Sequence, residues 1–229
     1  MFNHSEFNKF IINHNIIGFF EQPIKLVSGR TSHWYVSWRQ VFNDPYLLEK
    51  VAEWVVFYIR ENKIDIECLY GVPEGATKLA VVSSLKLAQK SGNYHQGSHV
   101  IPMGRAKPKE HGNPTDRFFV GTPRGKTLVI EDTVTTGGSL MESIDKLREV
   151  GIQVTAVLIL VNRMERRDDG KTVEEAIAER YNGEVKFYTI SSALELLPEI
   201  AAKQRPSVQI RESVEREFQL YGVKPIRLT

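Results

Sequence analysis

The chain has 229 residues, of which 41% are hydrophobic and 25% are charged, a composition typical of a globular protein with one core of ordinary size. A net charge of +2 excludes a fold built as a whole to bind a polyanion such as nucleic acid, so anions must be bound by local clusters. The single cysteine, Cys68, excludes a disulfide framework, and no apolar run is long enough to cross a bilayer. Because the N-terminus lacks a basic leader with a cleavage site, we expect a cytoplasmic protein without membrane or nucleic-acid partners.

Helical and extended segments alternate along the chain. The N-terminal part predicts a helix, two short extended pieces and a second helix, over Ser5–Ile17, Pro23–Ser28, His33–Trp38 and the stretch from Pro45 to Ile59. Strands are then expected at Ile64–Gly71, His99–Met103, Thr127–Ile130, Val154–Val161 and Val185–Ile190. The helices between and after them are expected at Ala76–Ala88, Ser139–Val150, Val173–Arg180 and Ala193–Ala201. Continuous apolar strands between amphipathic helices predict an α/β fold with a parallel sheet covered on both faces.

The most informative segment follows the strand Thr127–Ile130. The strand ends in two carboxylates, Glu131 and Asp132, and a turn rich in hydroxyl groups and glycine leads from them into the next helix. Backbone N–H groups in such a turn, with the helix N-terminus, favour a phosphate beyond the carboxyl end of a strand. The two carboxylates would repel a phosphate, so they are better suited to accept hydrogen bonds from ribose hydroxyls nearby. Taken alone, an acidic pair here could also be a solvated strand end.

This segment resembles the motif that binds phosphoribosyl pyrophosphate (PRPP) in type I phosphoribosyltransferases. The resemblance implies a central parallel sheet flanked by helices, with a small N-terminal hood. Glu131 and Asp132 would hold the ribose 2′- and 3′-hydroxyls, and Asp132 is also expected to act in catalysis. The 5′-phosphate would be cradled by Thr133, Val134, Thr135, Thr136, Gly137, Gly138 and Ser139. In the turn after the first core strand, the family's pyrophosphate-binding residues correspond to Val72 and Pro73, although a turn of this kind needs no function.

A basic stretch lies in the long polar loop that runs to about Thr115. It could be a mobile, solvated loop, or a lid that closes over pyrophosphate and neutralises its charge. Its residues Arg105, Lys109, His111 and Gly112 match the catalytic loop of orotate phosphoribosyltransferases. In that family the loop closes over the partner subunit's active site, which implies a homodimer with a shared site.

Two segments bear on the acceptor base. The stretch from Ser28 to Val36 resembles the hood motif of orotate phosphoribosyltransferases, and Tyr35 could cover a pyrimidine ring, although an ordinary amphipathic hairpin would look similar. Arg163 matches the arginine that recognises orotate, whose carboxylate suits a guanidinium, but it could also be a surface arginine in a charged run. The expected base-binding residues are Tyr35, Val36, Thr135 and Arg163.

The chain is therefore expected to transfer ribose 5-phosphate from PRPP to orotate, forming orotidine 5′-monophosphate with Mg²⁺ held mainly by the substrate rather than by a dedicated protein site. The expected organisation is one domain, with a hood over residues 1–45, a core over 46–200 and a C-terminal extension over 201–229. Three departures from the family pattern concern cations: Val27 and Ala106 stand at positions that are often basic, and the turn near Glu74 lacks a basic residue. They leave open a transferase for another base, or a PRPP-binding regulator without catalysis.

Overall fold

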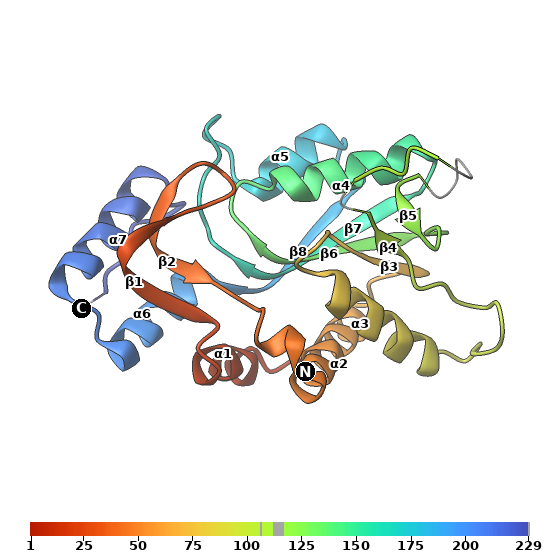
Figure 1. The fold of residues 1–229 in the computed structure, drawn as a ribbon, viewed down its shortest axis with the longest axis horizontal. Helices are drawn as coiled ribbons and strands as arrows, with labels where there is room; N and C mark the ends of the chain where they lie inside the picture. Colours follow the sequence, from red (N-terminus) through yellow and green to blue (C-terminus); the bar gives the residue numbers. More distant parts are fainter. Residues whose placement is uncertain (106, 112–116, 229) are drawn as a thin grey trace.

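A four-stranded parallel sheet forms the centre of the molecule (Figure 1), in a computed structural model that describes residues 1–105, 107–111 and 117–228. The strand order is β3-β6-β7-β8. The strands span β3 (Cys68–Gly71), β6 (Thr127–Val134), β7 (Val154–Asn162) and β8 (Lys186–Ser192). Because parallel neighbours need crossovers, each pair of successive strands is joined through a helix that lies on the sheet. This arrangement confirms the α/β fold that the sequence predicts.

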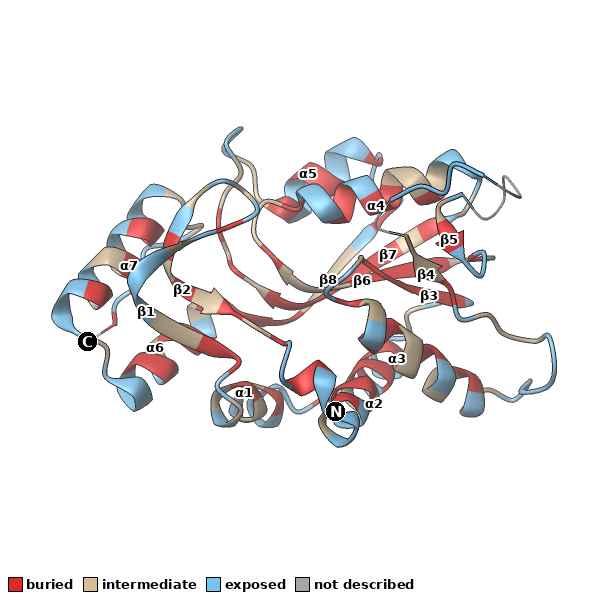
Figure 2. Cartoon of the chain, in the orientation of Figure 1, coloured by how far each residue is buried: buried red, intermediate tan, exposed pale blue. Residues whose placement is uncertain are grey.

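Helices cover both faces of the sheet (Figure 1), which is why its strands read as continuous apolar runs. One face carries α4 (Gly138–Glu149) and α5 (Val173–Arg180), and the other carries α2 (Pro45–Glu61) and α3 (Thr77–Gln89). Successive residues of β6 serve the two faces alternately: Leu128 packs in the core with α2 and α3, and Val129 in the core with α4. Burial is accordingly concentrated along the strands and on the inner helix faces (Figure 2).

The N-terminal segment forms a helix and an antiparallel hairpin. The helix α1 (His4–Asn13) begins where Asn3 caps the N–H of Glu6 at 3.1 Å, and the hairpin pairs β1 (Ile17–Lys25) with β2 (Thr31–Val36). The expected helix to Ile17 and strand from Pro23 were therefore wrong in extent. The chain leaves the helix at Asn15, whose φ is +49°, so that the next residues can enter β1. A short 3-10 helix, η1 (Val41–Asn43), then leads into α2.

A second small hairpin lies outside the main sheet. It pairs β4 (Met103–Gly104) with β5 (Phe119–Val120) in antiparallel fashion. The expected strand His99–Met103 was wrong, because only its last residue, Met103, belongs to a strand. Pro102 has no N–H to donate to a ladder, which explains why the pairing begins after it.

The C-terminal segment adds two helices, α6 (Ala193–Gln204) and α7 (Val208–Leu220). The sequence predicted α6, although with an earlier end, and left α7 without an interpretation. α7 packs against the hairpin β1–β2 (Figure 1), where the rings of Trp34 and Phe218 stack with centroids 6.1 Å apart. One apolar core therefore includes side chains from the hood, the sheet and the tail. Among the described residues, no helix is long and apolar enough to cross a membrane.

Candidate active site

The turn between β6 and α4 lies at the carboxyl end of a strand that is paired on both sides. Gly137 is the N-cap of α4 and adopts the left-handed conformation, with φ at +74°. A Cβ atom there would lie 2.7 Å from Cγ1 of Val173, so backbone conformation and close packing both require glycine. Gly138 and Ser139 at the start of α4 are exposed, and Thr135 and Thr136 are partly buried. The first N–H groups of α4 are thus accessible at the sheet edge, where an anion is favoured.

The acidic pair lies directly before this turn, and both residues are partly buried. Burial raises the pKa of Glu131 to about 8, and the charge of Asp132 adds to the effect. Burial raises the pKa of Asp132 to about 6, although hydrogen bonds from backbone N–H groups and the charge of Arg39 act in the opposite direction. Within the described residues, Oε2 of Glu131 and Oγ1 of Thr133 are buried without a hydrogen-bond partner. Such poorly solvated groups with unused hydrogen-bonding capacity are suited to bind hydroxyl groups or a cation.

The turn after β3 lies beside this acidic pair. Val72 continues the strand, since its N–H donates to the carbonyl of Ile130 at 2.9 Å. A Cβ atom on Gly75 would lie 3.0 Å from Oδ1 of Asp132, so the turn approaches the carboxylate as closely as a glycine allows. Val72 is buried, Pro73 is partly buried, and Glu74 and Gly75 are exposed. The structure therefore brings together the two strand ends that the sequence assigns to PRPP.

The basic loop begins beside the turn after β3. A Cβ atom on Gly104, the last residue of β4, would collide with the hydroxyl of Tyr70 and the ring of Pro73. Arg105 follows immediately, and its backbone N–H donates to the carbonyl of Phe118 at 2.9 Å. The base of the loop is thus held by the small hairpin against the predicted pyrophosphate-binding turn, and Arg105 directly follows the glycine that contacts this turn.

Beyond Arg105 the basic residues extend into solvent. Lys107, Lys109 and His111 are all exposed, and the N–H of Lys109 donates to the carbonyl of Arg117 at 2.8 Å. The predicted match at Gly112 and the departure at Ala106 lie outside the described residues. The side chains of Lys107, Lys109 and His111 are therefore accessible from solution, whereas Nε of Arg105 donates to the carbonyl of Phe119 at 3.3 Å.

In the hood, neighbouring residues of β2 face opposite sides, as a strand requires. Trp34 and Val36 point into the core, whereas Tyr35 is partly exposed on the other face. Tyr35 and Val36 therefore cannot offer their side chains to the same face of a base. Val27, at the position that is often basic in the family, is 99% exposed.

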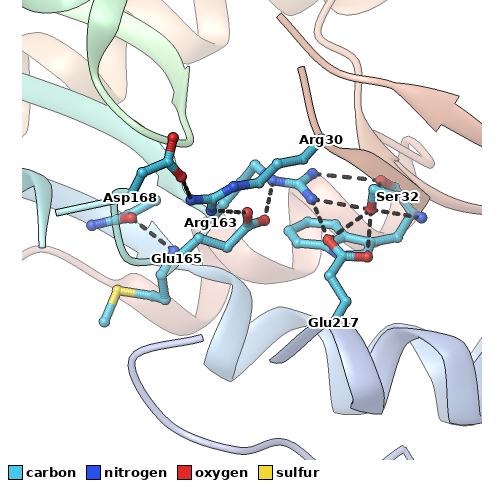
Figure 3. Close-up of polar contacts among 9 residues, drawn as sticks. Arg30, Ser32, Arg163, Glu165, Asp168 and Glu217 are labelled. Atoms are coloured by element: carbon cyan, nitrogen blue, oxygen red, sulfur yellow. Dashed lines mark hydrogen bonds and ion pairs between the residues drawn. The ribbon is translucent and has the colours of Figure 1, made fainter. Parts of the chain in front are cut away.

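Arg163 directly follows β7, and its backbone N–H donates to the carbonyl of Val134 at 3.0 Å. Val134 is the last residue of β6, next to the turn between β6 and α4, which we call the phosphate turn. The side chain of Arg163, however, is 2% exposed and lies between two carboxylates (Figure 3). Nε donates to Oε1 of Glu165 at 2.8 Å, and Nη2 donates to Oε1 of Glu217 at 2.9 Å. Nη2 also donates to the hydroxyl of Ser32 at 3.1 Å, and the guanidinium carbon is 3.6 Å from the centre of the Trp34 ring.

The carboxylate of Glu217 is surrounded by donors. It accepts from the hydroxyl of Ser32 at 2.9 Å and from the indole N–H of Trp34 at 3.1 Å, besides Arg163. Burial nevertheless raises the pKa of Glu217 to about 7, because desolvation and the nearby charge of Glu165 outweigh the effects of Arg163 and the hydrogen bonds.

A second arginine completes this buried charge cluster. Arg30 donates to Oε2 of Glu165 at 3.1 Å and to the exposed Asp168 at 2.6 Å (Figure 3). Its guanidinium carbon also lies 4.2 Å from the centre of the Tyr221 ring. The two arginines and the two buried carboxylates balance in charge, so the cluster has no net charge to attract a further anion when all four are ionised.

Two contacts near the site were not expected from the sequence. Glu217 lies on the apolar stripe that α7 forms with Ile210, Val214 and Phe218. A carboxylate in such a stripe indicates a buried cation partner, but the sequence does not say which one. Arg167 donates to the carbonyl of Thr136 in the phosphate turn, a contact between segments that no local pattern connects.

No family model matches the chain, but its sequence and its fold are both similar to those of orotate phosphoribosyltransferases. It is 31% identical over 162 residues to the orotate phosphoribosyltransferase of Marinobacter nauticus, covering 70% of this chain and 72% of that protein. It is 34% identical over 153 residues to the orotate phosphoribosyltransferase of Bradyrhizobium diazoefficiens, covering 64% of this chain and 76% of that one. The fold is similar to that of the Francisella tularensis orotate phosphoribosyltransferase, with a TM-score of 0.66 at 21% identity over 95% of this chain and 99% of the other.

Proposed function

This chain belongs to the orotate phosphoribosyltransferase family, and we propose on that premise that it transfers the phosphoribosyl group of PRPP to N1 of orotate. The products are orotidine 5′-monophosphate and pyrophosphate, and the reaction is a step of pyrimidine biosynthesis. The proposal rests on one observation above all: the acidic pair, the phosphate turn and the turn after β3 lie together at one edge of the sheet. We further propose that the protein acts in the cytoplasm, where its buried thiol, Cys68, would stay reduced.

Each part of PRPP has a suitable partner at this edge. Glu131 and Asp132 accept hydrogen bonds from the ribose hydroxyls, a role supported by the unpartnered Oε2 of Glu131. The 5′-phosphate binds to the N–H and hydroxyl groups from Thr133 to Ser139, supported by the accessible start of α4. The pyrophosphate lies against the backbone of Val72 and Pro73, supported by the close approach of that turn to Asp132.

A Mg²⁺ ion fits the same donor set. Within the described residues no group of three or more His, Cys, Asp or Glu side chains could hold a metal alone. The two adjacent carboxylates suit an ion that keeps most of its coordination on substrate oxygens and water. Asp132 and Glu131 are the residues that would contact it, directly or through the ribose hydroxyls. When bound, the ion supplies positive charge to the departing pyrophosphate.

Catalysis is then mainly a matter of charge. Breaking the bond between the anomeric carbon and pyrophosphate leaves positive charge on the ribose ring and negative charge on the leaving group. The basic loop supplies Arg105, Lys109 and His111 to the leaving group, and Lys109 or His111 can donate a hydrogen bond or proton to it. The exposure of Lys109 and His111, together with the attachment of the loop at Gly104, supports a lid whose base is fixed and whose cations can move. We propose that this lid acts on a partner subunit in a homodimer with shared sites.

Four residues are proposed to surround the base: Tyr35, Val36, Thr135 and Arg163. Tyr35 is accessible for stacking, whereas Val36 is buried and can shape the site only through its backbone or by packing. Arg163 has the chemistry to bind the orotate carboxylate, but its guanidinium must first give up part of its contact with Glu165 or Glu217. The burial of Arg163 is the observation that keeps a different base as a second candidate.

The direct test mixes the purified protein with orotate, PRPP and Mg²⁺ and follows the loss of orotate absorbance. Conversion that requires the metal and is reversed by pyrophosphate supports the proposal. Asp132→Asn should abolish PRPP binding, while Glu142→Gln, an exposed substitution on α4, serves as the control. Absence of conversion while PRPP still binds would refute orotate as the substrate, and the same assay with purine and other pyrimidine bases would then identify the acceptor.

A further inference from the structure

The C-terminal helix places a carboxylate on the arginine that is proposed to recognise orotate. Glu217 receives one N–H of the Arg163 guanidinium at 2.9 Å, in the manner of a substrate carboxylate. It is held there by the hydroxyl of Ser32 and the indole N–H of Trp34, so its position is set by both the tail and the hood. Among the described residues, Nε of Arg163 donates to Glu165, and Nη1 makes a long contact of 3.4 Å to the carbonyl of Trp34. Nη1 is therefore the most weakly bonded donor, but a carboxylate that binds Nη1 and Nη2 together must displace Glu217 from Nη2.

We propose that Glu217 is a specificity-determining residue that competes with the carboxylate of the acceptor base for Arg163. The inference rests on the proposed function, because it takes orotate as the ligand of Arg163. With both Glu165 and Glu217 ionised, an incoming carboxylate would meet two buried negative charges within the contact shell of one guanidinium. Withdrawal or neutralisation of Glu217 leaves Arg163 with one carboxylate partner and restores its capacity for the substrate.

The surroundings of Glu217 determine how this competition depends on pH. The charged groups that face it are Arg163 and Glu165, and Arg30 and Asp168 lie behind Glu165. From β2 only the uncharged donors of Ser32 and Trp34 reach it. Because burial brings the pKa of Glu217 to about 7, its protonated form is well populated under mildly acidic conditions. Orotate binding should therefore strengthen as the pH falls through neutrality, while its own carboxylate stays ionised.

The test compares Glu217→Gln with Glu212→Gln, the same chemical change on an exposed side chain of the same helix. The KM for orotate at saturating PRPP, the KM for PRPP and the dissociation constant for orotate by calorimetry are measured from pH 6 to pH 8.5. Glu217→Gln should lower the KM and the dissociation constant for orotate about tenfold at pH 8, the factor for one charged hydrogen bond. It should leave the KM for PRPP unchanged and remove the pH dependence of orotate binding. Glu212→Gln should behave as the unsubstituted protein.

An orotate KM that stays the same or rises in Glu217→Gln, in an enzyme that converts orotate, would overturn the inference and leave the proposed function intact. If the unsubstituted protein binds PRPP but does not convert orotate, the proposed function fails. The inference about Glu217 is then tested separately by calorimetry. It requires that Glu217→Gln binds orotate more tightly than the unsubstituted protein, and equal or weaker binding overturns it. If the variant does not fold, the unsubstituted protein decides, since orotate binding that is flat or weaker toward pH 6 contradicts the competition.

Discussion

Replacing Glu131 with glutamine should make the protein more stable at alkaline pH. The pKa of Glu131 rises from 4.5 to about 8 on folding, because the carboxylate is poorly solvated and lies beside Asp132. A carboxyl group whose pKa is raised in the folded state destabilises that state progressively as the pH rises from 4.5 toward 8. At about 1.4 kcal/mol per unit of pKa, full ionisation would remove about 5 kcal/mol. Since the side chain is only partly buried, solvent screening reduces the expected effect to about 2 kcal/mol.

The assay is urea denaturation without ligands at pH 5, 7 and 9, with Glu142→Gln as the control for an exposed glutamate. Glu131→Gln should match the unsubstituted protein at pH 5, where Glu131 is largely protonated when folded. It should exceed the unsubstituted protein by about 2 kcal/mol at pH 9, while its PRPP binding is lost. If the two proteins differ in stability by the same amount at pH 5 and pH 9, the reasoning is refuted. Such a result would mean that ionisation of Glu131 does not destabilise the folded state.

Two further substitutions test the phosphate turn. Gly137→Ala forces a Cβ atom toward Val173 at a positive φ, so the free energy of unfolding should fall by about 1–3 kcal/mol in thermal unfolding. PRPP binding should weaken as well, and an unchanged melting temperature would contradict the geometry. Arg167→Gln removes the contact to the carbonyl of Thr136, so the KM for PRPP should rise several-fold with little change in the KM for orotate. Arg166→Gln, which removes a contact to the carbonyl of Gly170 rather than one to the phosphate turn, is the matched control in steady-state kinetics. Equal effects of the two variants would argue against a specific role for Arg167.

The sequence predicts the centre of this molecule well, because the information there is local. The strand from Thr127 is identified by its continuous apolar run, the helix from Ser139 by its amphipathic pattern, and the turn between them by its glycines and hydroxyl groups. The acidic pair and the turn after β3 meet because the carboxyl ends of adjacent parallel strands share one edge of the sheet, which follows from the fold class alone.

What the sequence does not predict depends on long-range contacts. Arg163 and Glu217 are 54 residues apart, and no local pattern indicates that α7 would turn a carboxylate toward the end of β7. The small hairpin at Gly104 pairs segments whose two-residue strands are too short to show a period. From the sequence, an arginine at a strand end is expected to be available for a ligand. The direction of its side chain, however, depends on the partners that distant parts of the chain supply.

The contacts between β2 and α7 have a consequence for how the molecule opens. Ser32 and Trp34 bind Glu217, and the Trp34 ring stacks on Phe218, so the first hairpin and the last helix share both a polar and an apolar interface. Undocking of either segment would expose the Arg163 guanidinium and the Glu165 carboxylate at once. The two ends of the chain should therefore open as one cooperative unit, with amide hydrogens in β2 and α7 exchanging at matching rates.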